Sequence, residues 1–140
     1  MSVRQIGKYK MPTQSQLRRV KNTLPLIVGN TAKNHFTEGF RLGGRRTDKS
    51  RSGWKRRKRQ DSGRAILVGK GTGTLRKDIQ VRRKRFDYIV VGTGEDTKNY
   101  AYVHNEGVGN MPQREFLGHS TVLTKKTMII VNREIMKYFK

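Results

Sequence analysis

The chain has 140 residues, 33% of them hydrophobic, and 32 Lys and Arg against 10 Asp and Glu give a formal net charge of +22. This size allows one domain with one modest core, and a hydrophobic fraction below the roughly 45–50% of soluble globular chains predicts loops or arms that order against a partner. The absence of cysteine excludes disulfides, thiol catalysis and Cys-ligated zinc. No apolar run has the length of a membrane span or a signal peptide, so we expect a soluble protein made in a reducing cytoplasm.

The N-terminal part of the chain predicts an arm and then a helical region. Residues 1–12 are basic and lack periodicity, so we interpret them as an N-terminal arm. Thr13 and Gln16 have the spacing of a capping box, which opens a helix. Apolar residues then recur mostly at three- and four-residue steps over residues 17–40, as they do on one face of a helix.

Pro25 interrupts this helical pattern. A proline inside a helix removes a backbone donor and clashes with the preceding turn. We therefore expect two helical pieces, with the break at Thr23 or Leu24. Gly43 and Gly44 should end the second piece.

Residues 41–63 are predicted to form a long basic loop, with 43–63 as an extension of the domain. The stretch has no periodicity, and loops of this length inside a compact domain are usually functional. Trp54 is the exception, because its ring can anchor the loop to the core. We predict contacts with partner molecules for eight residues of this loop: Arg45, Arg46, Trp54, Lys55, Arg56, Arg57, Lys58 and Arg59.

The five consecutive cations at residues 55–59 permit three interpretations: a solvated loop, a contact with a polyanion, or a contact with an acidic patch on a neighbouring protein. Each neutralised phosphate releases counterions, so non-specific affinity for DNA or RNA is expected at this charge. Without aromatic residues interleaved in the run, it gives no indication of base-specific recognition.

The second half of the chain predicts a hairpin and a final helix. Ile79, Val81 and residues 88–91 flank residues 84–87 as two strands flank a turn. Residues 100–103 fit either a further short strand or a helical turn.

Apolar residues spaced from Leu117 to Phe139 indicate a C-terminal helix. The predicted fold is therefore α+β, with a small antiparallel sheet packed with an N-terminal and a C-terminal helix. We expect residues 13–140 to form a single domain.

No motif for catalysis or cofactor binding emerges. The glycines from Gly69 to Gly73 lack the Ser or Thr that a phosphate-binding loop requires after its lysine, and the dinucleotide fingerprint lacks its third glycine. We interpret these glycines as turn residues and predict no enzyme activity, no cofactor and no metal.

The histidines, His35, His104 and His119, do not have the helical spacing of a zinc protease. We expect His35 at the boundary of the apolar helix face and a structural role for His104. A nuclease that uses His104 and Glu106 is an alternative, but no acidic metal-binding cluster accompanies them.

Four stretches of the chain share a further pattern. They are residues 53–54 with 66–68, residues 73–79, residues 91–93 with 100–107, and residues 111–118. The third ends in Tyr-Ala-x-x-His-x-x-Gly, and the fourth contains Pro-x-Arg-x-Phe-Leu-Gly. In order and spacing these stretches resemble the phage virion-morphogenesis, or tail-completion, family of head–tail joining proteins.

The motif residues are Tyr100, His104, Gly107, Pro112, Arg114, Phe116, Leu117 and Gly118. We expect Tyr100 and Tyr102 to cover the sheet, and Gly107 to turn the chain back. Pro112 should fix the entry to the last helix, with Phe116 and Leu117 filling the core at its first turn. Arg114 should donate hydrogen bonds to loop carbonyls.

The resemblance implies a structural subunit of a virion at the head–tail junction, made in the cytoplasm of the host bacterium. It implies a homo-oligomeric ring, expected to be a hexamer, that completes or terminates the tail or joins it to the neck. The implied partners are other neck, connector and tail-tube proteins, with a non-specific DNA contact in addition and no membrane. The very basic loop and arm depart from the family pattern. The alternative is a small basic nucleic-acid-binding protein, similar to a ribosomal protein.

Overall fold

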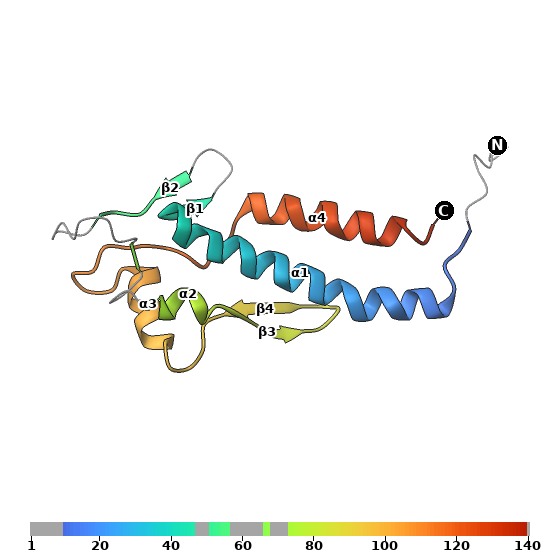
Figure 1. The fold of residues 1–140 in the computed structure, drawn as a ribbon, viewed down its shortest axis with the longest axis horizontal. Helices are drawn as coiled ribbons and strands as arrows, with labels where there is room; N and C mark the ends of the chain where they lie inside the picture. The colour runs from blue at the N-terminus through green and yellow to red at the C-terminus, as the bar shows by residue number, and fades with distance from the viewer. Residues whose placement is uncertain (1–9, 47–50, 57–65, 68–72, 140) are drawn as a thin grey trace, which may run out of the picture.

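One long helix organises the structure, a computed structural model that describes residues 10–46, 51–56, 66–67 and 73–139 (Figure 1). Helix α1 (Gln14–Leu42) lies between helix α4 (Thr121–Met136) on one side and a β-hairpin on the other. The other elements gather at the C-terminal end of α1. The expected α+β class, with a helix near each end of the chain, is confirmed.

Helix α1 begins and ends where the sequence predicts. The hydroxyl of Thr13 accepts a hydrogen bond from the backbone N–H of Gln16 (3.3 Å), and the side-chain oxygen of Gln16 accepts one from the backbone N–H of Thr13 (2.8 Å). The predicted capping box is therefore confirmed. Gly43 ends the helix with a left-handed φ of 64°, which glycine adopts without steric cost.

The predicted break at Pro25 is wrong, because α1 continues through this residue. Proline inside a helix costs about 3 kcal/mol, since one intrahelical hydrogen bond is lost. Leu24 and Pro25 are both buried, and α1 packs against α4 and the β3–β4 hairpin. These tertiary contacts stabilise the helix across the proline, as they do for most helices in proteins.

The region expected to be a loop contains a short hairpin. Strand β1 (Gly44–Arg46) pairs antiparallel with strand β2 (Arg51–Gly53), with Gly44 opposite Gly53. The prediction of a loop without secondary structure over 41–63 is therefore wrong. These strands consist of Gly, Arg and Ser, so they lack the apolar alternation that identifies a strand in a sequence.

The predicted second hairpin is confirmed. Strand β3 (Gln80–Lys84) pairs antiparallel with strand β4 (Ile89–Gly92), with a bulge in β3 just after Val81. The inner face of this hairpin packs on α1 at Gly29. A Cβ atom at Gly29 would lie 2.9 Å from Cγ1 of Val81 and 3.4 Å from Cγ2 of Ile89, so the hairpin approaches the helix closely only because this residue is glycine.

Two short helices, α2 and α3, stand before and after the β3–β4 hairpin in the chain. Residues 100–103, for which the sequence permitted either a short strand or a helical turn, belong to helix α3 (Lys98–Glu106). Helix α2 (Thr74–Lys77) is a single turn that leads into β3.

The C-terminal helix α4 begins later than predicted. Its N-cap is Ser120, whose hydroxyl accepts a hydrogen bond from the backbone N–H of Leu123 (3.3 Å). Phe116 and Leu117 therefore precede the helix, and their predicted place in its first turn is wrong. Pro112 lies farther upstream still and does not open α4.

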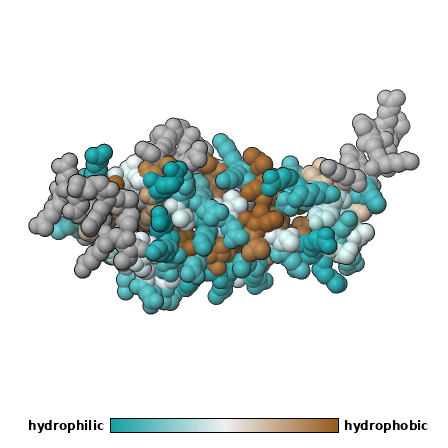
Figure 2. All heavy atoms as spheres, in the orientation of Figure 1, coloured by the Kyte–Doolittle hydropathy of each residue, from teal (hydrophilic) through white to brown (hydrophobic). Residues whose placement is uncertain are grey.

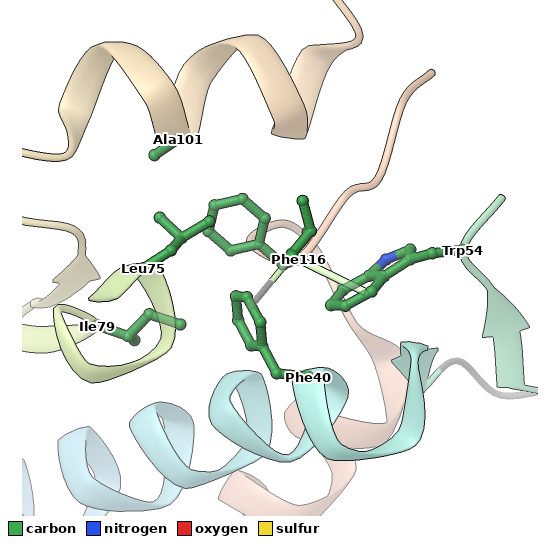
Figure 3. Close-up of a cluster of buried hydrophobic side chains, with 7 residues drawn as sticks. Phe40, Trp54, Leu75, Ile79, Ala101 and Phe116 are labelled. Carbon is green, nitrogen blue, oxygen red and sulfur yellow. The ribbon is translucent and has the colours of Figure 1, made fainter. Parts of the chain in front are cut away.

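The hydrophobic core joins segments that are distant in the sequence. Figure 3 shows Phe40 rising from the last turns of α1 toward Phe116, with Trp54 on one side and Leu75 on the other. The ring centroid of Phe40 lies 5.3 Å from those of both Trp54 and Phe116. The buried cluster consists of Phe40, Trp54, Leu67, Leu75, Ile79, Ala101 and Phe116. Trp54 thus anchors the β1–β2 region to the core, as predicted.

Candidate functional site

The extended segment 112–118 connects helix α3 with the β1–β2 region. The backbone N–H of Arg114 donates to the carbonyl of His104 (2.8 Å), and its Nε donates to the carbonyl of Lys55 (2.9 Å). Trp54 Nε1 donates to the carbonyl of Glu115 (3.0 Å). We call these contacts the 112–118 junction; they confirm the predicted hydrogen bonding of Arg114 to a loop carbonyl.

Asn105 supports the junction from the end of α3. Its Oδ1 accepts hydrogen bonds from the backbone N–H groups of Phe116 (3.0 Å) and Leu117 (2.9 Å). One amide oxygen thus satisfies two backbone donors and holds Phe116 in position to fill the core. The sequence does not single out this residue. The sequence feature that could have identified Asn105 is its position, two residues before Gly107, the glycine that ends the helix.

Gly107 is required at the turn after α3 by both its backbone and the available space. Its φ is 71°, and a Cβ atom there would lie 2.8 Å from the backbone nitrogen of Gln113. Its N–H donates to the carbonyl of Val103 and so closes the last turn of the helix (3.0 Å). The predicted reversal of the chain at this glycine is confirmed.

His104 is buried between α3 and segment 112–118. Its ring lies 4.4 Å from the ring of Tyr100, between centroids, and its carbonyl accepts the hydrogen bond from Arg114. Tyr100 and Tyr102 are exposed on the surface of α3. The expectation that they cover the sheet is wrong, because residues 100–103 are helical and direct both rings outward.

The remaining motif residues lie around the junction. Leu117 is half-buried against the core, and Pro112 is half-buried in the segment before it. Gly118 leaves room for the ion pair between Arg45 and the carboxylate of Glu115, because a Cβ atom there would contact both groups.

The residues predicted to contact partners differ in their surroundings. Arg45 is turned inward, since it pairs with Glu115 and donates to the carbonyl of His119. Lys55 and Arg56 are exposed, whereas Trp54 is buried. Arg46 lies in β1. The predicted contacts at Arg57, Lys58 and Arg59 lie outside the described residues.

Large hydrophobic side chains are exposed on several elements. Figure 2 shows a band of them across the middle of one face, where α4 and α1 lie side by side. Among the residues that the structure describes, the exposed large hydrophobic ones are Met11, Leu17, Leu26, Phe86, Tyr88, Val90, Tyr100, Tyr102, Val108, Met111, Met128, Ile129 and Met136.

The described part of the chain contains neither a cluster of metal-binding side chains nor a helix suited to a membrane. Over 10–46, 51–56, 66–67 and 73–139, no three or more His, Asp or Glu residues are grouped as they would be to hold a metal ion. Within the same ranges, no helix combines the length and apolar character needed to cross a membrane.

The 112–118 junction is therefore an arrangement of hydrogen bonds and packing that fixes the position of one chain segment against two others.

Comparisons of the chain with protein-family models, with curated proteins and with solved structures found no match.

Proposed function

We propose that the chain is a structural subunit of a phage virion at the head–tail junction. In this proposal, copies of the chain form a ring, expected to be a hexamer, that completes or terminates the tail or joins it to the neck. Its neighbours are connector, neck and tail-tube proteins. The role is one of assembly without catalysis, and it begins after synthesis in the cytoplasm of the host bacterium.

The observation that carries this proposal is the exposure of large apolar side chains on a strongly basic protein. Met128 and Ile129 on α4 are each 66% exposed, whereas the adjacent Ile130 is 9% exposed. Exposed apolar groups that gather in a band mark surfaces that bind other proteins. The band on α4 and α1 therefore favours a protein that works through its neighbours (Figure 2).

The chain segments that carry the family resemblance support the same proposal. Gly107, Arg114 and Phe116 each have a role in fixing segment 112–118, through a left-handed turn, a hydrogen bond to Lys55 and a place in the core. A motif whose residues fix the shape of a subunit fits a structural protein.

The test is native mass spectrometry and negative-stain microscopy of the full chain at high salt, which weakens both self-repulsion and nucleic-acid binding. Rings of one size, free of nucleic acid, are expected. Ile129→Ser should weaken the ring because it removes an exposed apolar side chain, whereas Asn132→Ser, on the exposed side of the same helix, should not. A monomer that carries one discrete RNA species would instead support the alternative of a small basic, ribosomal-protein-like nucleic-acid-binding protein.

A further inference from the structure

The β3–β4 hairpin has one face that α1 does not cover. Val81 and Ile89 point toward Gly29 of α1. Successive side chains in a strand point to opposite sides of the sheet, so Tyr88 and Val90 of this hairpin face away from the helix. Tyr88 is 37% exposed and Val90 is 41% exposed.

Two arginine side chains contact Tyr88 on this face. The hairpin carries four consecutive cations, residues 82–85, and a single acid, Asp87. The guanidinium carbon of Arg85 lies 5.1 Å from the centroid of the Tyr88 ring, and Nη1 of Arg83 donates to the Tyr88 hydroxyl (3.3 Å). Phe86, in the turn between the strands, is 55% exposed.

These contacts hold the groups in place before any ligand arrives. The bulge after Val81 places Arg83 opposite Val90 on the uncovered side. The Tyr88 ring is fixed between Arg83 and Arg85, so its orientation costs little entropy on binding. The face therefore offers flat apolar rings beside positive charges, spaced along a strand.

The chemistry of this face selects among polyanions. The carboxylates of an acidic peptide would satisfy the guanidinium groups, but acidic side chains offer no extended flat face to stack on Tyr88 and Phe86. In duplex DNA the bases are stacked on one another and cannot reach the rings. Single-stranded nucleic acid offers both phosphates and free base faces, and proteins bind it with basic surfaces that carry stacking aromatics.

We propose that the outer face of the β3–β4 hairpin binds single-stranded nucleic acid, with phosphates against Arg83 and Arg85 and bases stacked on Tyr88 and Phe86. This inference goes beyond the assembly role proposed above, and either can fail without the other. It also concerns a different element from the basic run at 55–59.

The first experiment measures fluorescence anisotropy of a labelled oligothymidylate with the full chain. Tyr88→Leu and Phe86→Leu should each weaken binding about fivefold to 100-fold, because each removes a stacking ring while keeping an apolar side chain. Tyr88→Phe keeps the ring and should bind within about twofold of the parent. Tyr102→Leu, which removes an exposed tyrosine from α3, is the matched control and should change nothing.

The second experiment measures the salt dependence of the same binding. The double variant Arg83→Gln/Arg85→Gln should make the slope of log K against log salt shallower by about 1.4, since each single-strand phosphate contact contributes about 0.7. The control pair Arg18→Gln/Arg19→Gln, exposed on α1, should leave the slope unchanged.

Three results would overturn the proposal. One is equal binding by the Tyr88→Leu and Tyr102→Leu variants, with folding of both verified by circular dichroism. Another is equal affinity for a duplex that has the same number of phosphates. The third concerns phosphatidylserine vesicles. If Phe86→Leu weakened vesicle binding more than it weakened oligothymidylate binding, the face would be assigned to a lipid surface. Native mass spectrometry of the Tyr88→Leu variant shows whether it still forms the same oligomer as the parent protein. A loss of nucleic-acid binding can then be told apart from a loss of ring formation.

Discussion

Replacing Gly29 with alanine tests the contact between α1 and the β3–β4 hairpin. Alanine inside a helix is favoured over glycine by about 0.5–1 kcal/mol, so a Gly→Ala change in an uncrowded helix should stabilise the protein. At Gly29, however, the added methyl group would lie 2.9 Å from Cγ1 and 3.2 Å from Cγ2 of Val81. These distances are too short for a relaxed contact, so helix and hairpin must move apart.

The movement is costly because the neighbouring groups are stiff. Val81 is β-branched and strongly prefers one rotamer, and its strand is paired to β4. Overpacking of this kind costs about 1–3 kcal/mol, which exceeds the gain in helix propensity. We therefore expect Gly29→Ala to lower the free energy of unfolding by roughly 1–2 kcal/mol.

Urea unfolding followed by circular dichroism measures this change, and the Val81→Ala background supplies the decisive comparison. With the valine methyl groups removed, Gly29→Ala should become stabilising by about 0.5–1 kcal/mol, the value of its helix propensity alone. Asn30→Ala, one residue along and exposed, should not destabilise in either background. If Gly29→Ala stabilised the parent protein as Asn30→Ala does, the close approach of the hairpin would be refuted.

Substitutions at three further positions test the junction and the last helix by chemical and thermal unfolding. Asn105→Ala should cost about 2 kcal/mol or more, because the N–H groups of Phe116 and Leu117 lose their acceptor, and Asn105→Asp should cost less because it keeps the oxygen; equal losses would contradict this role. Trp54→Phe should cost about 1 kcal/mol for its lost indole hydrogen bond, against about 3–5 kcal/mol for Trp54→Ala, and a loss for Phe as large as for Ala would argue against the core position of the ring. Ser120→Ala should cost about 1 kcal/mol by removing the N-cap of α4, and no change would place the start of the helix elsewhere.

Features decided by neighbouring residues are predictable from the sequence. The capping box at Thr13 and Gln16 and the helix end at Gly43 each depend on groups a few positions apart. The β3–β4 hairpin is predictable for the same reason, since Ile79 and Val81 on one side and the apolar run 88–91 on the other flank a short turn. In these places local preference and the final fold agree.

Features decided by distant residues are not predictable in this way. The penalty at Pro25 is visible in the sequence, but the burial that offsets it comes from α4 and the β3–β4 hairpin, which follow much later in the chain. The β1–β2 strands lack apolar alternation, and the start of α4 depends on where segment 112–118 is held.

The same division applies to the candidate site. Gly107 and Arg114 are identified by their motif, and their turn and hydrogen bond follow from the properties of glycine and arginine. Asn105 is not identified, because its role depends on the backbone of residues 116–117 lying against the end of α3.

The spacing of the core residues along the chain has a consequence during synthesis. Phe40 and Phe116 are in contact in the core but are separated by 76 residues of chain. At about 5–20 residues per second, a ribosome adds Phe116 about 4–15 s after Phe40, whereas helices form within microseconds. The α1 segment is therefore synthesised seconds before the elements that cover it, and its apolar residues are open to neighbouring nascent chains in that interval. Slow codons between these two residues are expected to lower the yield of folded protein while leaving the finished molecule unchanged.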